Sequence, residues 1–334
     1  MSPLPCIRTL VAALALAATQ AVAQPAVPAR PCTLLRWTTL GTAGGPVPTR
    51  DRSEPANLLD VGGDAILVDA GDGTVSQLAR IGRDLRNVHR IFLSHLHWDH
   101  VGGLAAVIGL RWMNDFPGDL TIYGPPGTRT LVRGIVTSLG PSAQIGFGTG
   151  AKVTDPAANL HVVELGNGSR ITPLEGLTVS ATRNTHFDAA LDGAGALSLS
   201  YRFDLRDRAI TYSGDTGPSE ALTALARGSD LLVSEVIALE PLFADISAHR
   251  PDMSPVTRAE MRRHLATHHI DAAEVGRMAA RAGVGQVVMT HFAVPGPLAS
   301  IESYLRDGVA RSYQGPVALA RDLGSFDVAC HDPN

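Results

Sequence analysis

The sequence contains a single lysine, three cysteines and no apolar stretch long enough to cross a membrane. Because Lys152 stands alone and the arginines are dispersed, no basic run of the kind that follows a phosphate backbone is present. The formal net charge is -4 over 334 residues, which requires neither nucleic acid nor an anionic membrane as a partner. The apolar run Leu10–Ala18 falls well short of the ~20 residues that a spanning helix needs. We therefore expect no membrane span in the mature chain.

The first 23 residues have the features of a secretory signal peptide. Arg8 provides the positive end, Leu10–Ala18 is a short apolar run, and the small residues Ala21 to Ala23 form a cleavage signature. The pattern predicts cleavage before Gln24. We expect residues 24–334 to form one domain that is periplasmic or secreted.

Two of the three cysteines remain after the predicted cleavage. Cys6 lies in the removed segment, whereas Cys32 and Cys330 lie near the two ends of the mature chain. In an oxidising compartment an even pair indicates a disulfide, here Cys32–Cys330. Two free thiols are the alternative. Neither residue is close in sequence to the histidine-rich segment at residues 94–103, so we do not count them as metal ligands.

The order of predicted strands and helices indicates an α/β fold. Strands, helices, strands and helices follow one another twice, which fits an αββα sandwich of two mixed β-sheets flanked by helices. Gly62 and Gly63 separate two short apolar runs, as in a hairpin. We expect residues 140–156 to be a flexible excursion, and residues 237–256, which contain three prolines, to be irregular.

The segment Ser94–Gly103 contains four metal-binding side chains within six residues. Residues two apart on extended chain point the same way, so His95 and His97 can bind one metal. Asp99 and His100 follow a turn and can bind a second metal close by. A polar surface loop is the alternative, but His-x-His-x-Asp-His consists only of donors suited to zinc.

Further candidate ligands stand where predicted strands end: His186, Asp215 and His291. Single histidines at such places are more often structural than ligands, so their assignment depends on the 94–103 segment. We predict that His95, His97 and His186 bind one zinc ion and that Asp99, His100 and His291 bind another. Asp215 can bridge both ions together with a hydroxide, which gives a nucleophile without serine or cysteine. Manganese or iron could also occupy such N/O sites.

One carboxylate, Asp69, is expected to support these ligands rather than to bind metal. It ends a buried strand, where an unpaired carboxylate would be costly, so it should accept hydrogen bonds from the histidine segment. His89, His161, His249, His264 and His331 have no such setting and are expected to be ordinary surface residues. His268 is left unassigned.

These motifs resemble the metallo-β-lactamase-fold hydrolase superfamily over about residues 34–292. An acidic residue at 215 is unlike true β-lactamases. The segments Leu40–Pro46, Val68–Gly73 and Val287–Phe292 are similar to the ribonuclease Z and arylsulfatase-like branch. That resemblance implies that His269 contacts the scissile group or protonates the leaving oxygen, and that Glu235 orients His269. The branch usually has His-Ser-Thr where this chain has His269-Ile270-Asp271.

The function expected from these observations is hydrolysis of a phosphodiester or sulfate ester in a small-molecule substrate, with Asp99, Asp215, His269 and Glu235 in the catalytic site. A lactonase or another carboxyl-ester hydrolase is the alternative for the same centre. A non-catalytic metal-binding or nucleic-acid-binding relative is a third possibility. An exported protein would not meet precursor tRNA, and the 140–156 excursion has only Lys152 as a basic residue, so nucleic acid is not the expected partner. The sequence does not determine the oligomeric state, and a homodimer is compatible with it.

Overall fold

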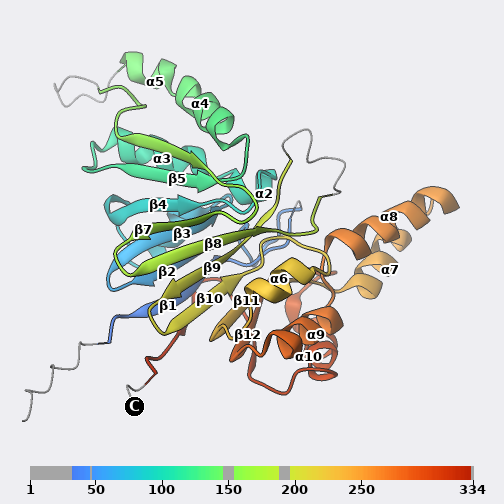
Figure 1. Ribbon diagram of the computed structural model, residues 1–334. Coiled ribbons are helices and arrows are strands. Elements are labelled where there is room, and N and C mark those ends of the chain that lie inside the picture. Colours follow the sequence, from blue (N-terminus) through green and yellow to red (C-terminus); the bar gives the residue numbers. More distant parts are fainter. Residues whose placement is uncertain (1–31, 46, 146–153, 188–195, 332–334) are drawn as a thin grey trace, which may run out of the picture. The chain divides into compact units, whose positions relative to one another are not determined.

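The computed structural model describes residues 32–45, 47–145, 154–187 and 196–331 (Figure 1). The predicted signal peptide, residues 1–23, lies outside the described residues. All elements named below belong to the unit Thr33–Asn334. Cys32 and Cys330 are both disulfide-bonded, as the sequence predicts. Within the described part of the chain, no helix combines the length and the apolar character that a membrane crossing requires.

One seven-stranded sheet is built mainly from the N-terminal half of the chain. Its first strands pair antiparallel, whereas β3 to β6 pair parallel. In spatial order the strands are β14 (Gly324–Asp327), β1 (Leu35–Gly41), β2 (Ala56–Val61), β3 (Asp64–Ala70), β4 (Val88–Phe92), β5 (Leu120–Gly124) and β6 (Leu160–Glu164).

The other seven-stranded sheet is also mixed. Strands β7 to β10 pair antiparallel, whereas β10 to β13 pair parallel. In spatial order the strands are β13 (Val317–Leu319), β12 (Gln286–Ala293), β11 (Leu231–Ile237), β10 (Arg208–Tyr212), β9 (Leu199–Leu205), β8 (Leu177–Arg183) and β7 (Arg170–Leu174). The predicted two mixed sheets are therefore confirmed.

Apolar side chains from both sheets form a common core between them. Alternation along the strands explains this packing: Leu59 of β2 faces the second sheet, whereas its neighbour Leu58 packs under the helices on the other face. Aromatic rings fill the centre, and the ring centroids of Phe92 and Tyr201 are 5.5 Å apart. Such aromatic burial is a large part of what holds two sheets together.

Helices cover the outer faces of the sheets, which completes the αββα arrangement (Figure 1). α1, α3 and α4 belong to the apolar layer on the first sheet, and α6, α9 and α10 contact strands of the second. The helices are α1 (Thr74–Arg80), α2 (Trp98–Val101), α3 (Leu104–Met113), α4 (Thr128–Ser138), α5 (Gly140–Ile145), α6 (Glu220–Leu225), α7 (Leu239–His249), α8 (Pro255–His268), α9 (Ala272–Ala282) and α10 (Glu302–Ala310).

One expectation about an irregular segment was wrong, and another was wrong for its first six residues. Residues 237–256 contain helix α7 and the start of α8 rather than irregular chain. The prolines do not break these helices because Pro241 lies in the first turn of α7 and Pro255 is the first residue of α8, after the Ser254 N-cap, where no backbone N–H is needed. The predicted excursion 140–156 begins with helix α5, and residues 146–153 lie outside the described residues.

Candidate metal centre

Three histidine side chains from two separate segments converge at the end of β4. His95 and His97 follow β4 directly, and His186 follows β8. His97 Nδ1 is 3.0 Å from His95 Nε2 and 3.1 Å from His186 Nε2. The three ring nitrogens therefore face one point, which brings together the three residues predicted to share one zinc ion.

Hydrogen bonds at the far side of the rings determine which nitrogens are free. His186 Nδ1 is 2.9 Å from the backbone carbonyl of His268, which can only accept, so the proton of a neutral His186 is on Nδ1. His95 Nδ1 is 3.1 Å from Ser94 Oγ, whose own proton is donated to Asp69. The Nε2 lone pairs of both rings are thus directed at the common point, which is the arrangement of ligating histidines.

A second group lies beside the first and contains Asp99, His100, Asp215 and His291. The Nε2 atoms of His100 and His291 are 3.3 Å apart, and each is 3.2 Å from Asp215 Oδ1. Asp99 Oδ2 is 3.5 Å from His100 Nε2 and 3.6 Å from His291 Nε2. The sequence-predicted second set of ligands is therefore also brought together.

Asp215 faces both groups, one with each carboxylate oxygen. Its Oδ2 is 3.9 Å from His95 Nε2 and 4.0 Å from His186 Nε2, while Oδ1 faces the second group. The side chain is almost fully buried, yet Oδ1 has no hydrogen-bond partner. A buried carboxylate oxygen without a hydrogen-bond donor is unfavourable unless a cation lies beside it. The residues present therefore fit divalent metal ions.

Asp69 is fully buried and holds the second group in place. It accepts four hydrogen bonds: from Ser94 N, Ser94 Oγ, His100 Nδ1 and Tyr212 Oη, at 2.7 to 2.8 Å. The contact with His100 places the proton on Nδ1 and leaves Nε2 free for the centre. Asp69 thus lies where the sequence places it, and Tyr212 is a partner that the sequence did not indicate.

Two residues of the site lie at β-bulges. The pairing of β2 with β3 passes from Ala70 to Val68 and skips Asp69, whose φ is 60°. The pairing of β11 with β12 passes from Thr290 to Phe292 and skips His291, whose φ is 45°. A bulge turns a side chain away from the regular alternation, so in both cases the extra residue directs its side chain to the centre.

His269 and Glu235 form a pair at the edge of the centre. His269 Nδ1 is 2.9 Å from Glu235 Oε2, and the other Glu235 oxygen accepts a hydrogen bond from Thr216 N. A ring nitrogen of His269 lies within 4.8 Å of ligand atoms of His186 and Asp215. Burial would lower the pKa of His269, but the Glu235 carboxylate outweighs it and raises that pKa to about 9. This imidazole is therefore positioned and charged to donate a proton.

The two groups of ligands differ in their protonation. Burial lowers the pKa of His95 and His97 below the usual value and that of His186 to about 3. Burial acts in the same direction on His100 and His291, but Asp215 together with Asp69 at His100, and with Asp99 and Glu235 at His291, outweighs it and raises both pKa values. The first group is therefore neutral, whereas a cation at the second would displace protons.

Two neighbours of the centre were missed from the sequence. The Phe187 ring lies 4.8 to 5.7 Å from the rings of His95, His97 and His186 and covers that group. Glu54 is half-buried, one of its oxygens has no hydrogen-bond partner, and burial together with the Asp99 charge raises its pKa. Neither stands in a motif, so only the three-dimensional structure reveals them. Of the unassigned histidines, His268 contributes its backbone carbonyl, as described above.

Comparison with known proteins matches the stretch of chain that contains the metal centre. The model of a family described as the β-lactamase superfamily domain matches residues 64–292. A ribonuclease Z from Mycobacterium avium is 31% identical over 298 residues, covering 88% of this chain and 99% of the relative. A ribonuclease Z from Mycobacterium bovis is 29% identical over the same length, with the same coverage of both chains. Since these relatives are ribonucleases by name, they do not support the expectation that nucleic acid is not a partner.

Solved structures share the fold at lower sequence identity. The metallo-β-lactamase fold protein YhfI from Bacillus subtilis superposes with a TM-score of 0.64 at 18% identity, covering 88% of this chain and 100% of that one. Human tRNase Z, short form, superposes with a TM-score of 0.60 at 20% identity and the same coverage. These likenesses concern the fold alone.

Proposed function

Since the chain belongs to the metallo-β-lactamase superfamily, in its ribonuclease Z branch, we propose that it binds two zinc ions and hydrolyses phosphodiesters or sulfate esters. Membership makes it a metal-dependent hydrolase of ester bonds. The two-ion stoichiometry is supported by one observation: Asp215 presents Oδ1 to one group of ligands and Oδ2 to the other. The nitrogen-rich donor set favours zinc, and manganese or iron would use the same residues.

The residues that would hold the ions are those of the two groups. His95, His97 and His186 form one site, Asp99, His100 and His291 form the other, and Asp215 belongs to both. Two bound divalent ions supply an acidified water and neutralise the charge of the substrate oxygens. Asp69 and the His268 carbonyl keep the imidazoles oriented throughout.

His269 is proposed to protonate the leaving group. Its Nδ1 is held by Glu235 at 2.9 Å, and its pKa of about 9 keeps it protonated at neutral pH. A positioned acid matters most for alkoxide leaving groups, which are poor without a proton. A lactone also releases an alkoxide, so the preference for phosphodiesters and sulfate esters rests on membership of the ribonuclease Z branch.

The test combines metal analysis with a panel of substrates. Protein expressed in zinc-supplemented medium should contain close to two zinc ions per chain, and the Asp215→Ala variant should contain clearly fewer. Bis-p-nitrophenyl phosphate, p-nitrophenyl sulfate and an acyl-homoserine lactone should then be compared under identical conditions. Metal-free protein would overturn the proposal, and faster lactone hydrolysis would assign the centre to a lactonase.

Export to the periplasm or medium is proposed as well. It is supported by the apolar run Leu10–Ala18 with the small residues Ala21–Ala23. The disulfide-bonded state of Cys32 and Cys330 also fits an oxidising compartment. Mass spectrometry of fractionated cells should detect a chain that begins at Gln24 outside the cytoplasm. A full-length chain confined to the cytoplasm would contradict export.

A further inference from the structure

Four arginines line a surface pocket of ≈ 670 Å³ that shares no residue with the metal centre. They come from three places along the chain: Arg170 from β7, Arg202 from β9 with Arg206 just after it, and Arg227 beyond α6. Asp204 is the one acidic residue in the lining. The pocket therefore carries a net charge of about +3 (four arginines, one aspartate) in a chain whose formal net charge is -4.

One arginine forms the fixed part of the pocket. Arg202 Nε donates to Asp204 Oδ1 at 2.7 Å, and its Nη1 donates to the backbone carbonyls of Leu225 and Arg227 and to Ser229 Oγ at 2.8 to 3.0 Å. These bonds leave Nη2 without a partner among the described residues. The guanidinium is thus held rigidly, and one of its amino groups remains free to bind a ligand.

The remaining positive charges are uncompensated. Arg170 donates only to the Ser180 hydroxyl, at 3.1 Å. Arg206 and Arg227 are exposed, and neither side chain has a hydrogen bond or ion pair with another described residue. Asp204 is already neutralised by Arg202. Three guanidinium groups of one pocket therefore lack an acidic partner among the described residues, which gives the pocket a positive potential that attracts anions.

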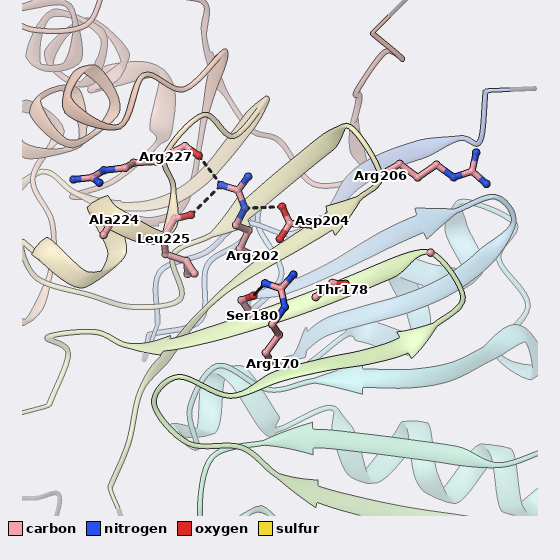
Figure 2. A pocket seen from close by; sticks show the side chains of 10 residues that line it. Arg170, Thr178, Ser180, Arg202, Asp204, Arg206, Ala224, Leu225 and Arg227 are labelled. Atoms are coloured by element: carbon pink, nitrogen blue, oxygen red, sulfur yellow. Dashed lines mark hydrogen bonds and ion pairs between the residues drawn. The ribbon is translucent and has the colours of Figure 1, made fainter. Parts of the chain in front are cut away.

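The arrangement of the four arginines suggests an extended ligand. Figure 2 shows Arg227 and Arg206 at the two ends of the pocket, with Arg202 and Arg170 between them. The lining contains hydroxyls but hardly any apolar surface beyond Ala224 and Leu225. Guanidinium forks match the geometry of phosphate oxygens, whereas a large apolar ligand would find nothing to pack against. A row of such groups suits a chain of phosphates better than a single one.

The pocket lies away from the metal centre along β8. Thr178 lines the pocket near the start of this strand, and His186 follows the other end. Five residue steps separate Thr178 from Arg183, and at about 3.3 Å per step they span roughly 17 Å. A ligand in the pocket would therefore not compete directly for the metal ligands.

We propose that this arginine pocket binds a ligand with several linked phosphate groups, at a site separate from the metal centre. Two kinds of ligand have such a row of phosphate groups: a free polyphosphate and the phosphodiester backbone of an RNA strand. This proposal goes beyond the hydrolysis proposed above, because it is tested by measuring ligand binding to the pocket and not by measuring hydrolysis.

The experiment compares the parent with an Arg206→Gln/Arg227→Gln double variant and with Arg311→Gln, an exposed arginine outside the pocket. Tripolyphosphate binding is measured by calorimetry and binding of a fluorescein-labelled oligouridylate by anisotropy across a salt series. Each neutralised phosphate contributes about 0.7 to the slope of log affinity against log salt for single strands. The double variant should therefore lose about 1.4 of that slope, and Arg311→Gln should lose none.

The two probes separate the sources. Weakened tripolyphosphate binding in the double variant supports the site with a free polyphosphate as its ligand, and a reduced slope with oligouridylate supports it with an RNA backbone. The proposal is overturned if the parent binds neither probe, or if the double variant and Arg311→Gln bind as the parent does. The single variants Arg206→Gln and Arg227→Gln repeat the test if the double variant is unstable. Unchanged hydrolysis of bis-p-nitrophenyl phosphate shows that the metal centre is intact.

Discussion

Replacing Asp69 with asparagine is expected to release metal from one side of the centre while the fold persists. Four donors converge on the Asp69 carboxylate, two of them from Ser94 and one each from His100 and Tyr212. Asparagine keeps the shape but replaces one acceptor oxygen with an amino group. Because the Ser94 backbone N–H can only donate, the amide oxygen must remain at the Oδ1 position. The amino group then faces the other three partners.

These partners respond differently to the amino group. The hydroxyls of Ser94 and Tyr212 can rotate and accept. His100 can accept only if its proton moves from Nδ1 to Nε2, and Nε2 is the atom that faces Asp215 and His291. A protonated Nε2 cannot bind a metal ion. Loss of a partner that orients a ligating histidine typically lowers metal affinity ~10–100-fold. Neutralising these charge-assisted bonds should lower the free energy of unfolding by roughly 2–4 kcal/mol.

Zinc content and stability can be measured on the same preparations. After dialysis against limiting zinc, the Asp69→Asn variant should retain about one ion fewer than the parent, and guanidinium unfolding should give the stability change. Tyr212→Phe is the matched control, because it removes one donor but leaves the carboxylate and the His100 tautomer unchanged. It should keep its zinc and lose roughly 1 kcal/mol.

The reasoning would be refuted if Asp69→Asn bound both ions as tightly as the parent. It would also be refuted if Tyr212→Phe lost as much zinc as Asp69→Asn, because the effect would then depend on packing rather than on the tautomer of His100.

Three further outcomes follow from the same geometry. His269→Ala should lower kcat by ~10²–10⁴ on alkyl phosphodiesters and less on p-nitrophenyl esters. The pKa of His269 is raised, so kcat should decline as its proton is lost when the pH rises through about 9. Glu235→Gln should move that alkaline decline in kcat to lower pH. On acidification, zinc should leave the side with His100 and His291 first, because their raised pKa values let protons compete for the ring nitrogens at higher pH. The zinc content of the protein is measured as the pH is lowered, and loss of both ions in one step would contradict this prediction. Gly217→Ala would bring a Cβ to 1.8 Å from the Thr267 carbonyl oxygen and should lower the free energy of unfolding, measured by urea unfolding, by ~1–3 kcal/mol. Gly134→Ala in α4 meets nothing within 4 Å and should not destabilise the protein.

The ligand groups could be predicted because their chemistry is local in sequence or tied to strand ends. The spacing of His95, His97 and Asp99 fixes relative directions within a few residues. His186 and Asp215 follow strands whose apolar pattern is strong, so the edge at which they emerge is set by the sheet. The fold class followed from the order of the predicted strands and helices.

Other features depend on contacts that sequence patterns do not encode. Pro241 was taken as a break, yet the first turn of a helix tolerates proline, and only the position of the helix start reveals this. Arg170, Arg202 and Arg227 are dispersed along the chain, so the sequence shows no basic run although the fold brings them to one pocket. The Tyr212 hydroxyl reaches Asp69 from the opposite sheet, which no local pattern indicates.

The two bulges at Asp69 and His291 imply a conflict between robustness and activity. Each places a side chain with a β-carbon in left-handed backbone, which costs of order 1–3 kcal/mol. Glycine at either position would relieve that strain and delete the group that the distortion serves to aim. Under selection for thermal endurance alone, we expect replacements to accumulate at these two positions early. Their retention would then mark lineages in which turnover still matters.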